Sequence, residues 1–284
     1  KGSAPHVLAM TATPIPRTLA FTVHGDMEIS IIDELPKNRI PIITKIMDPK
    51  KMNDVYNFIK KEIESGRQCF VVYPLIEESE KLDLKAAETE YKNISENIFP
   101  NLNIGFIHGK MKKETIDSQM KKFEKNIIQC MVSTTVIEVG INIPNASVMI
   151  IENADRFGLT QLHQLRGRIG RGIHQSYCIL IPNKKTDLAI QRLKILRSTN
   201  DGFIIADEDL KIRGPGDFFG TKQHGYLKSK IINFAKDGKI IKHARNSAID
   251  LLNLDPNLNN KKNKLIRDYL IENYKEMLTY INVN

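Results

Sequence analysis

The stretch NDVYNFIKKEIESGRQCFVVYPLI, residues 53–76, joins a helix-like segment to a short apolar run rich in β-branched and aromatic residues. More apolar runs of this kind follow along the chain, and a second helix-like segment, residues 112–126, separates two of them. Alternation of strand and helix predicts an α/β fold in which a parallel sheet carries helices on both faces. The apolar runs are CFVVYPLI, NIGFIHG, IIQCMVSTT, SVMIIENA and SYCILIP, residues 69–76, 103–109, 127–135, 147–154 and 176–182.

Loops that follow the strands are the first places to look for function. In an open parallel sheet, ligand-binding groups gather beyond the carboxyl ends of the strands. The loops after MVSTT and after MIIENA, which end at Thr135 and Ala154, therefore take priority over the outer surfaces of the helices.

The composition is that of an ordinary soluble globular protein, since 41% of the 284 residues are hydrophobic and 26% are charged. Forty-two Lys and Arg residues against 33 Asp and Glu give a formal net charge of +9, which points to a polyanionic partner such as nucleic acid. Cys69, Cys130 and Cys178 lie in apolar runs without metal-ligand spacing, so we expect reduced core thiols in a cytoplasmic protein. No uncharged stretch approaches the ~18 residues that a membrane helix needs, so no membrane association is expected.

Three regions follow from these patterns. Residues 1–48 hold one strand and a proline-rich segment, and they read as the tail of a preceding domain plus a linker. Residues 49–184 form the sheet-bearing lobe, and residues 185–284 are expected to be mainly helical with a Gly-rich loop. Because the sequence begins with Lys1 just before an apolar run, we expect a piece of a longer chain. The last predicted helix carries one apolar stripe, expected to dock on the lobe: Ile266, Leu270, Tyr274, Met277 and Ile281.

The segment QLHQLRGRIGRG, residues 161–172, concentrates arginine and glycine. On a helix that begins near Thr160, the spacing of four and three places Gln164, Arg168 and Arg171 on one outward-facing stripe. Guanidinium groups match phosphate oxygens and can stabilise the charge that develops on a transferred phosphoryl group. The alternative is a solvated basic helix face. Two glycines inside the helix favour a functional role, because each weakens a helix by ~1 kcal/mol and permits close approach of another backbone or a ligand. The apolar residues of the segment are expected to be buried against the sheet: Leu162, Leu165 and Ile169.

A phosphate-binding loop is not evident in this sequence. In the pattern G-x-x-x-x-G-K-[ST], Gly-Lys is followed by Ser or Thr, but Met111 follows Gly109-Lys110 and Ile240 follows Gly238-Lys239. We therefore expect the arginines to serve a nucleotide that another domain holds.

Three segments together resemble helicases of superfamily 2. MTATPIPRT, MVSTTVIEVGINIPNA and QLHQLRGRIGRG, residues 10–18, 131–146 and 161–172, are similar to motifs III, V and VI of those enzymes. YPLIEESEKLDLKAAE and RFGLTQLHQLRGRIGRG, residues 73–88 and 156–172, resemble the RecG family of ATP-dependent DNA helicases. The resemblance implies a RecA-like second motor lobe. It also implies that the first motor lobe, with its phosphate loop and acidic box, precedes Lys1.

The resemblance assigns nucleotide roles by motif position. It implies that Arg168 and Arg171 contact ATP phosphates across the cleft between two lobes, and that Gln164 positions the attacking water or the γ-phosphate. It places Gly140 and Asn142 near the nucleotide ribose. Because many superfamily 2 proteins have Asp where this chain has Asn142, a neutral hydrogen bond is expected there. ATP and magnesium are expected to be held mainly by the first lobe.

DNA-facing roles are expected in other motifs. Thr134 and Thr135 can donate hydroxyl and backbone N–H groups to a DNA phosphate without reading sequence, although strand propensity explains them equally well. His108 and Gly109 open the loop after IGFI, residues 104–107, and either contact the DNA backbone or, for His108, cap or pack locally. Motif III contributes two further residues that contact DNA or couple it to the nucleotide: Thr11 and Thr13.

The segment DEDLKIRGPGDFFGTKQHG, residues 207–225, resembles the translocation motif that the RecG family shares with the transcription-repair coupling factor Mfd. Its glycines predict a loop of unusual backbone geometry, in which Arg213 and Gln223 supply hydrogen-bond donors. Such a loop can relay closure of the lobes to DNA or to the preceding helices. The alternative is a passive glycine-rich connector.

The function expected from the sequence is that of the C-terminal motor lobe of an ATP-dependent DNA helicase or translocase. Its substrate would be branched or double-stranded DNA, such as stalled forks and junctions in recombination and repair, and this chain alone would not hydrolyse ATP. Two alternatives remain: an Mfd-like transcription-repair coupling translocase, and a non-catalytic nucleic-acid-binding module that uses the charge of +9.

Overall fold

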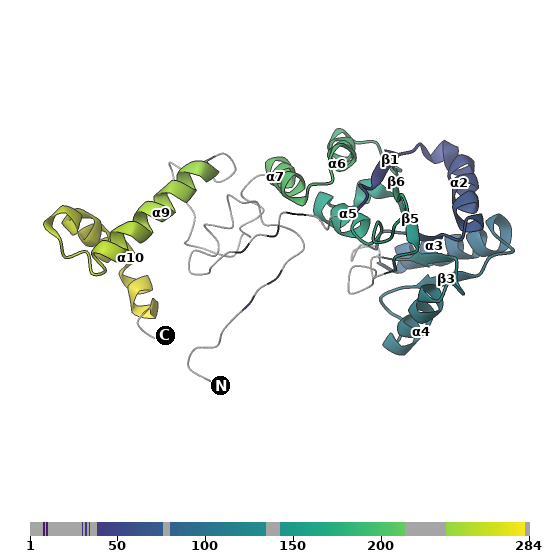
Figure 1. Cartoon of the computed structure of the whole chain (residues 1–284), viewed down its shortest axis with the longest axis horizontal. Coiled ribbons are helices and arrows are strands. Elements are labelled where there is room, and N and C mark those ends of the chain that lie inside the picture. The colour runs from purple at the N-terminus through teal and green to yellow at the C-terminus, as the bar shows by residue number, and fades with distance from the viewer. Residues whose placement is uncertain are drawn as a thin grey trace. The chain divides into compact units, whose positions relative to one another are not determined.

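A computed structural model describes residues 39–75, 80–134, 143–213 and 237–281, together with the single positions 8, 10, 30, 32 and 34. The chain forms two compact units, of which one is Ser30–Arg213 and the other combines Lys1–Ile29 with Gly214–Asn284. The first unit carries the sheet, and the second carries two of the described helices (Figure 1).

The sheet of the first unit consists of parallel strands in the order β1-β6-β5-β2-β4-β3, as far as the described residues go. Each apolar run that predicts a strand contains one, so the predicted α/β fold is confirmed. The strands are β1 (Ile43–Ile46), β2 (Gln68–Val72), β3 (Ile104–Ile107), β4 (Cys130–Ser133), β5 (Ala146–Glu152) and β6 (Tyr177–Ile181).

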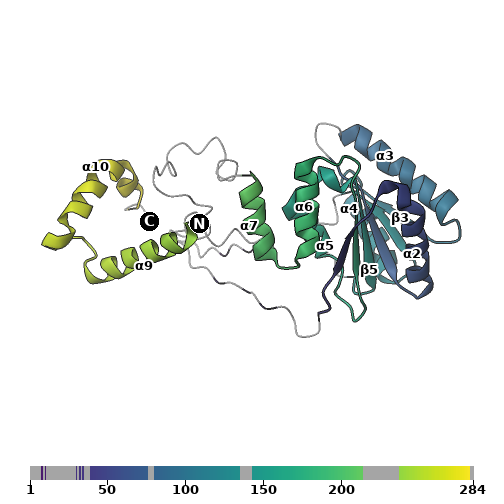
Figure 2. The same ribbon diagram turned by 90° about the horizontal axis from the view of Figure 1, so that it is seen from above.

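Helices cover both faces of this sheet. Apolar residues of α2 and α3 pack on one face, and those of α4, α5, α6 and α7 pack on the other. Figure 2 shows α2 and α3 together beside the sheet. The helices are α2 (Met52–Glu64), α3 (Glu80–Asn93), α4 (Lys113–Glu124), α5 (Leu159–Arg166), α6 (Asp187–Ser198), α7 (Gly202–Arg213), α9 (Gly238–Leu254) and α10 (Lys264–Ile281). Short turns of helix lie at η1 (Pro49–Lys51), η3 (Ile94–Ile98), η5 (Ala154–Arg156) and η6 (Lys261–Asn263).

The helix α2 illustrates how local sequence produces this layer. Asp48 caps the preceding turn, because its side chain accepts a hydrogen bond of 3.0 Å from the backbone N–H of Lys50. Val55, Ile59 and Ile63 follow at intervals of four and are all buried, so one stripe of the helix faces the sheet. Gly66, with φ of 84°, then turns the chain into β2 in a conformation that glycine adopts without strain.

Burial on both faces explains the apolar strands. In β5, Val148 and Ile150 pack on the α2 side, whereas Met149 and Ile151 pack on the α5 side. The three cysteines lie in these strands as buried free thiols, as predicted, and the residues of the segment 161–172 that were expected to be buried are fully inaccessible: Leu162, Leu165 and Ile169.

A buried glutamine side chain, that of Gln68 at the start of β2, makes hydrogen bonds to neighbouring loops. The amide nitrogen of Gln68 donates to the carbonyl oxygens of Phe123, at 2.5 Å, and Ile128, at 2.7 Å. Its carbonyl oxygen accepts a hydrogen bond of 3.1 Å from the side chain of Asn145. Because Gln68 is completely buried, these bonds replace those that its polar atoms would make with water.

The sheet-bearing unit is wider than residues 49–184, the limits expected from the sequence. β1 lies before residue 49 in the segment interpreted as a linker, yet it pairs in parallel with β6 along the edge of the sheet. After residue 184, α6 and α7 still belong to this unit. Side-chain contacts tie both extensions down, since the amino group of Lys185 lies 2.7 Å from a carboxylate oxygen of Asp48. β1 has only four residues and alternates between exposed and buried positions, so it lacks the continuous apolar run of the central strands.

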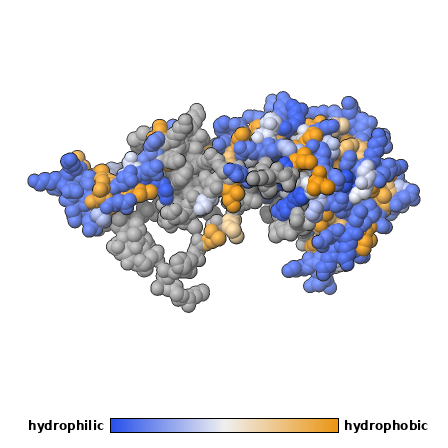
Figure 3. Space-filling view, in the orientation of Figure 1, coloured by the Kyte–Doolittle hydropathy of each residue, from blue (hydrophilic) through white to orange (hydrophobic). Residues whose placement is uncertain are grey.

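The second unit contains α9 and α10, in the region that the sequence predicts to be mainly helical. Asp255 organises the turn between them, because its carboxylate accepts hydrogen bonds from the side chain of Asn263 and from the backbone N–H groups of Asn259 and Asn260, at 2.8 to 2.9 Å. These bonds lower the pKa of Asp255, and the bond from Asn263 has the largest effect. Figure 3 shows apolar residues of this unit interspersed with hydrophilic ones.

Docking of the apolar stripe on the lobe stays a prediction. Ile266 is 45% exposed within the described residues. The side chains of Tyr274, Met277 and Ile281 lie outside what the structure describes.

No described helix has the length and apolar character needed to span a bilayer.

Candidate functional site

The helix α5 ends earlier than the arginine spacing predicts. It runs from Leu159 to Arg166, and Gly167 forms its C-terminal cap. Beyond the cap the chain turns, and the backbone N–H of Arg168 donates to the carbonyl oxygen of Leu165 at 2.9 Å. The prediction that Gln164, Arg168 and Arg171 share one helical stripe is therefore wrong. A glycine costs a helix only ~1 kcal/mol, so the spacing alone does not reveal where the helix stops.

The glycines after the helix permit close approach of other parts of this chain. Gly170 has φ of 73°, and a Cβ atom placed there would lie 2.8 Å from Cγ1 of Ile42. A Cβ atom at Gly172 would overlap the carbonyl oxygen of Pro144. The expected close approach is thus found, and the approaching groups are the segment before β1 and the segment before β5. We call residues 167–172 the arginine turn.

The arginine turn carries a concentration of positive charge. The Arg171 side chain is exposed, and its Nε donates to the carbonyl oxygen of Gly167 at 3.3 Å. Partial burial, and then the neighbouring charges of Arg168 and Arg39, lower the pKa of Arg171. Because like charges raise one another's energy, an anion bound beside these guanidinium groups would be stabilised.

Arg39 is a residue that the sequence analysis did not single out. It lies in the segment interpreted as a linker, but that segment is held beside the arginine turn. The side chain of Gln175 donates to the carbonyl oxygen of Pro41 at 2.8 Å, and Ile42 packs where Gly170 lacks a side chain. The sequence holds no local signal for this proximity, because the two segments lie more than 120 residues apart.

Arg166 differs from the other two arginines of the segment, since only 2% of it is exposed. Its Nη1 lies 2.6 Å from the carbonyl oxygen of Leu196, 2.8 Å from that of Thr199 and 3.3 Å from the hydroxyl of Thr44. A signal for this burial exists in the sequence, because Arg166 follows Leu162 by four positions and so continues the apolar stripe.

His163 completes the surroundings of Arg166. Its Nδ1 lies 3.2 Å from Nη2 of Arg166, and because a guanidinium only donates, Nδ1 accepts and the ring is neutral. Burial first, and then the charge of Arg166, lower the pKa of His163 to about 4. Asp201 opposes this shift and Arg39 adds to it.

This arrangement predicts a pH-dependent stability of the lobe. The pKa of His163 is about 4 in the folded chain, below its value of about 6.5 in the unfolded chain. The stability that the neutral ring contributes to the folded state is therefore complete above pH 6.5, and it is lost as the pH falls toward 4. Between pH 7 and 4.5 we expect the free energy of unfolding to fall by about 1 to 2 kcal/mol more in the wild type than in His163→Gln. Urea unfolding at several pH values measures this difference. Equal pH dependence in the two proteins, or an NMR titration midpoint of His163 near 6.5, would contradict it.

The helices after the sheet are fastened to α5 and to the turn before it. The hydroxyl of Thr160 donates to a carboxylate oxygen of Asp209 in α7 at 3.1 Å. From α6, the guanidinium of Arg192 donates to the carbonyl oxygens of Phe157, at 2.8 Å, and Asp155, at 3.1 Å. These bonds couple α6 and α7 to α5, the helix that precedes the arginine turn, and to the turn before α5.

The remaining predicted residues are placed as follows. Gln164 and His108 are half-buried, and Nδ1 of His108 accepts from the backbone N–H of Lys110 at 3.3 Å, which agrees with the local alternative for this histidine. Gly109 is exposed. Thr134 is completely buried at the end of β4, and its hydroxyl has no hydrogen-bond partner among the described residues. The backbone of Arg213 ends α7, but its side chain is not described. The predicted site residues outside the described ranges are Thr11, Thr13, Thr135, Gly140, Asn142 and Gln223.

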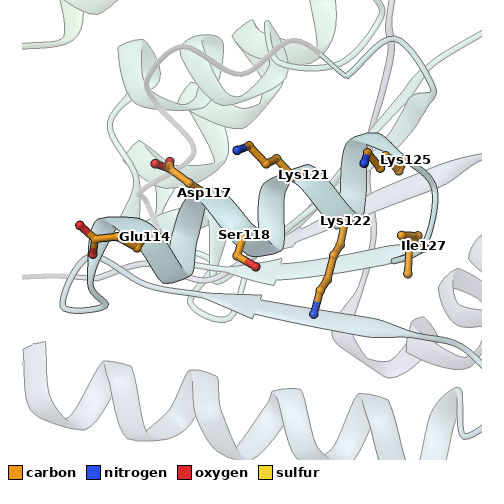
Figure 4. A pocket seen from close by; sticks show the side chains of 7 residues that line it. All are labelled: Glu114, Asp117, Ser118, Lys121, Lys122, Lys125 and Ile127. Carbon is orange, nitrogen blue, oxygen red and sulfur yellow. The ribbon is translucent and has the colours of Figure 1, made fainter.

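A surface hollow beside α4 does not share these properties. It is lined by acidic groups toward the start of the helix and by lysines toward its end, and Lys121 and Lys122 point to opposite sides (Figure 4). The charges do not converge, so the hollow presents no anion site. In the described ranges there is also no group of three or more His, Cys, Asp or Glu residues that could hold a metal ion.

Comparison with known proteins agrees with this geometry. The model for the helicase conserved C-terminal domain matches residues 50–172, which include strands β2 to β5 and the arginine turn. The model for ATP-dependent DNA helicase RecG, domain 3, C-terminal, matches residues 199–284. The chain belongs to the RecG family.

Relatives of this RecG-family chain are close in sequence. Proteins named ATP-dependent DNA helicase RecG share 50% identity over 98% of the chain in Synechocystis and 46% over 96% in Bacillus subtilis. The chain spans only 33% and 40% of the length of these two proteins. A solved structure described as RecG bound to a three-way DNA junction is 42% identical, with a TM-score of 0.65 over 81% of this chain and 30% of that one. These matches identify the RecA-like helicase lobe and favour the RecG reading over the Mfd-like one.

Proposed function

We propose that this RecG-family chain is the second motor lobe and translocation region of an ATP-dependent DNA helicase that remodels branched DNA. The observation that carries the proposal is the match to relatives named as such helicases over nearly the whole chain. The solved relative on a three-way junction supports branched DNA as the substrate class, in recombination and repair. We place the protein in the cytoplasm, where its DNA substrate lies.

The nucleotide-facing part of this function belongs to the arginine turn. Arg171 and Arg168 contact the phosphates of a nucleotide held by a first motor lobe, and Gln164 positions the attacking water or the γ-phosphate. The crowding of Arg39, Arg168 and Arg171 supports a polyanionic ligand at this surface. Gly140 and Asn142 approach the ribose.

ATP fits the arginine turn through its phosphates, because guanidinium groups match phosphate oxygens. The described part of this chain has no cluster of His, Cys, Asp or Glu side chains that could bind magnesium, so we place the magnesium site in the first lobe. When bound, ATP supplies the phosphoanhydride bond whose hydrolysis drives the motor. The residues of this chain orient the phosphates and stabilise negative charge on them.

Contacts with DNA belong to the loops at the carboxyl ends of the strands and to the segment after α7. His108, Gly109, Thr134 and Thr135 contact the DNA backbone. For Thr134 this requires its buried hydroxyl to become accessible when the lobe binds DNA. Further residues contact DNA or couple it to the nucleotide: Thr11, Thr13, Arg213 and Gln223.

A turnover assay tests this proposal. We expect this chain alone to show no ATP hydrolysis above background with or without a DNA junction. The protein that joins it to a first motor lobe should hydrolyse ATP at a rate that branched DNA increases about tenfold or more. DNA-stimulated hydrolysis by this chain alone, or its absence from the longer protein, would overturn the proposal.

A further inference from the structure

Arg166 directly precedes the arginine turn, and its guanidinium is buried against the end of α6 instead of facing solvent. Its guanidinium contacts four acceptors, which come from α5, from β1 and from the end of α6. None of these four acceptors is a carboxylate. The burial of this cation lowers its pKa and is compensated by carbonyl, hydroxyl and imidazole groups.

Two of the acceptors are carbonyl groups at the end of α6. α6 ends at Ser198 with Thr199 as its cap, and the last carbonyl groups of a helix have no partners within it. The carbonyl oxygens of Leu196 and Thr199 instead bind Arg166 at 2.6 and 2.8 Å. A cation is favourable here, because the C-terminal end of a helix carries partial negative charge. Arg166 thus takes the place of water at these two carbonyl groups.

The same residue ends α5 and directly precedes the arginine turn. Its carbonyl oxygen accepts from the backbone N–H of Ile169 at 3.3 Å, and Gly167 directly follows it. Ile169 is completely buried, so the first half of the turn cannot shift without moving the core. The orientation of Arg168 and Arg171 therefore depends on how firmly Arg166 is held.

We propose that Arg166 is a positioning residue: it fixes the arginine turn against the end of α6 so that Arg168 and Arg171 are presented to a transferred phosphoryl group. This inference rests on the proposed function of those two residues. Arg166 does not touch the nucleotide, and it acts through the turn that follows it.

Hydrogen exchange on this chain tests the structural half of the proposal. In Arg166→Gln, backbone amides in the last turn of α6 and in residues 167–172 should exchange at least about tenfold faster than in the wild type. Arg197→Gln is the matched control, because Arg197 is an exposed arginine near the end of α6, the helix whose last carbonyl groups Arg166 contacts. Unchanged exchange in Arg166→Gln would overturn the proposal. Arg166→Lys keeps the buried charge and provides a second variant should the glutamine variant not fold.

Ligand discrimination tests the functional half in the protein that includes a first motor lobe. ADP resembles the ground state, and ADP with aluminium fluoride resembles the transferred phosphoryl group. Arg166→Gln should bind ADP within about twofold of the wild type but should bind ADP with aluminium fluoride at least about tenfold more weakly. Arg166→Lys should lie between the two.

A purely structural role would weaken both ligands equally or neither, and either result would overturn the proposal. Arg171→Gln separates this outcome from a failure of the proposed function. If Arg171→Gln also leaves ADP–aluminium fluoride binding unchanged, the arginine turn does not face the nucleotide. If only Arg166→Gln leaves it unchanged, the turn keeps its function and Arg166 is not what positions it.

Discussion

Arg171→Ala, made in the protein that joins this chain to a first motor lobe, should lower the rate of DNA-stimulated ATP hydrolysis by about 10³-fold or more. The physical reason is that an arginine directed at a transferred phosphoryl group stabilises charge that exists only in the transition state. The structure leaves Arg171 exposed on the arginine turn, and partial burial first, then the charges of Arg168 and Arg39, lower its pKa. A steady-state ATPase assay at saturating DNA measures the effect.

The folded state should tolerate this change, since substitutions at exposed positions usually alter stability by less than about 0.5 kcal/mol. Arg171→Lys should retain part of the activity, because lysine keeps the charge but lacks the planar fork of donors. Arg197→Ala, on an exposed face of α6, is the matched control and should hydrolyse ATP at the wild-type rate.

The opposite outcome would identify a different class of protein. If Arg171→Ala leaves ATP hydrolysis intact while DNA affinity falls and the dependence of binding on salt becomes less steep, Arg171 is a DNA-phosphate contact. The alternative of a non-catalytic nucleic-acid-binding module would then explain the charge of the turn.

Gly172→Ala should destabilise the lobe by about 2 to 3 kcal/mol. The added methyl group would overlap the carbonyl oxygen of Pro144, and the next atoms of that residue lie 3.2 and 3.8 Å from it. Backbone atoms cannot swing aside like the end of a long side chain, so the arginine turn and the segment before β5 would have to separate. Urea unfolding of this chain, followed by circular dichroism, measures the loss.

Gly66→Ala separates this steric effect from backbone strain. Gly66 has φ of 84°, but a methyl group there would meet nothing within 4 Å. Its substitution should cost only about 1 kcal/mol, the price of the left-handed conformation. If Gly66→Ala and Gly172→Ala cost the same, close contact with Pro144 does not explain the glycine at position 172.

Local pattern predicts much of the lobe. A central parallel strand is buried on both faces, so most of it is apolar and is visible as a run such as residues 148–151. The stripe of Leu162, Leu165 and Ile169 is likewise predicted correctly, because it depends on residues within a few positions of one another. The resemblance to the RecG family rests on motifs of the same kind, read along the chain.

Edges and ends of elements were not predictable in this way. β1 is a short edge strand after Pro41, with Ile43 41% exposed, so its pattern does not differ from that of an extended linker. Its place in the sheet depends on pairing with β6, more than 130 residues later in the chain. The end of α5 at Arg166 is hidden for a related reason, since the spacing of charges continues unchanged across Gly167.

The sequence by itself determined that three arginines and three glycines share the segment 161–172, and its resemblance to helicase motifs predicts a place for that segment in a nucleotide-dependent motor. Only the tertiary structure decided which arginine is buried and which is exposed. Arg166 is buried because β1 and the end of α6, 122 and 30 residues away, supply its acceptors. Arg171 remains exposed because it lies beyond the cap of α5, on a turn held by Ile42 and Pro144. Spacing along one helix can indicate which side of it is buried, but it does not identify the distant groups that accept hydrogen bonds from a buried arginine.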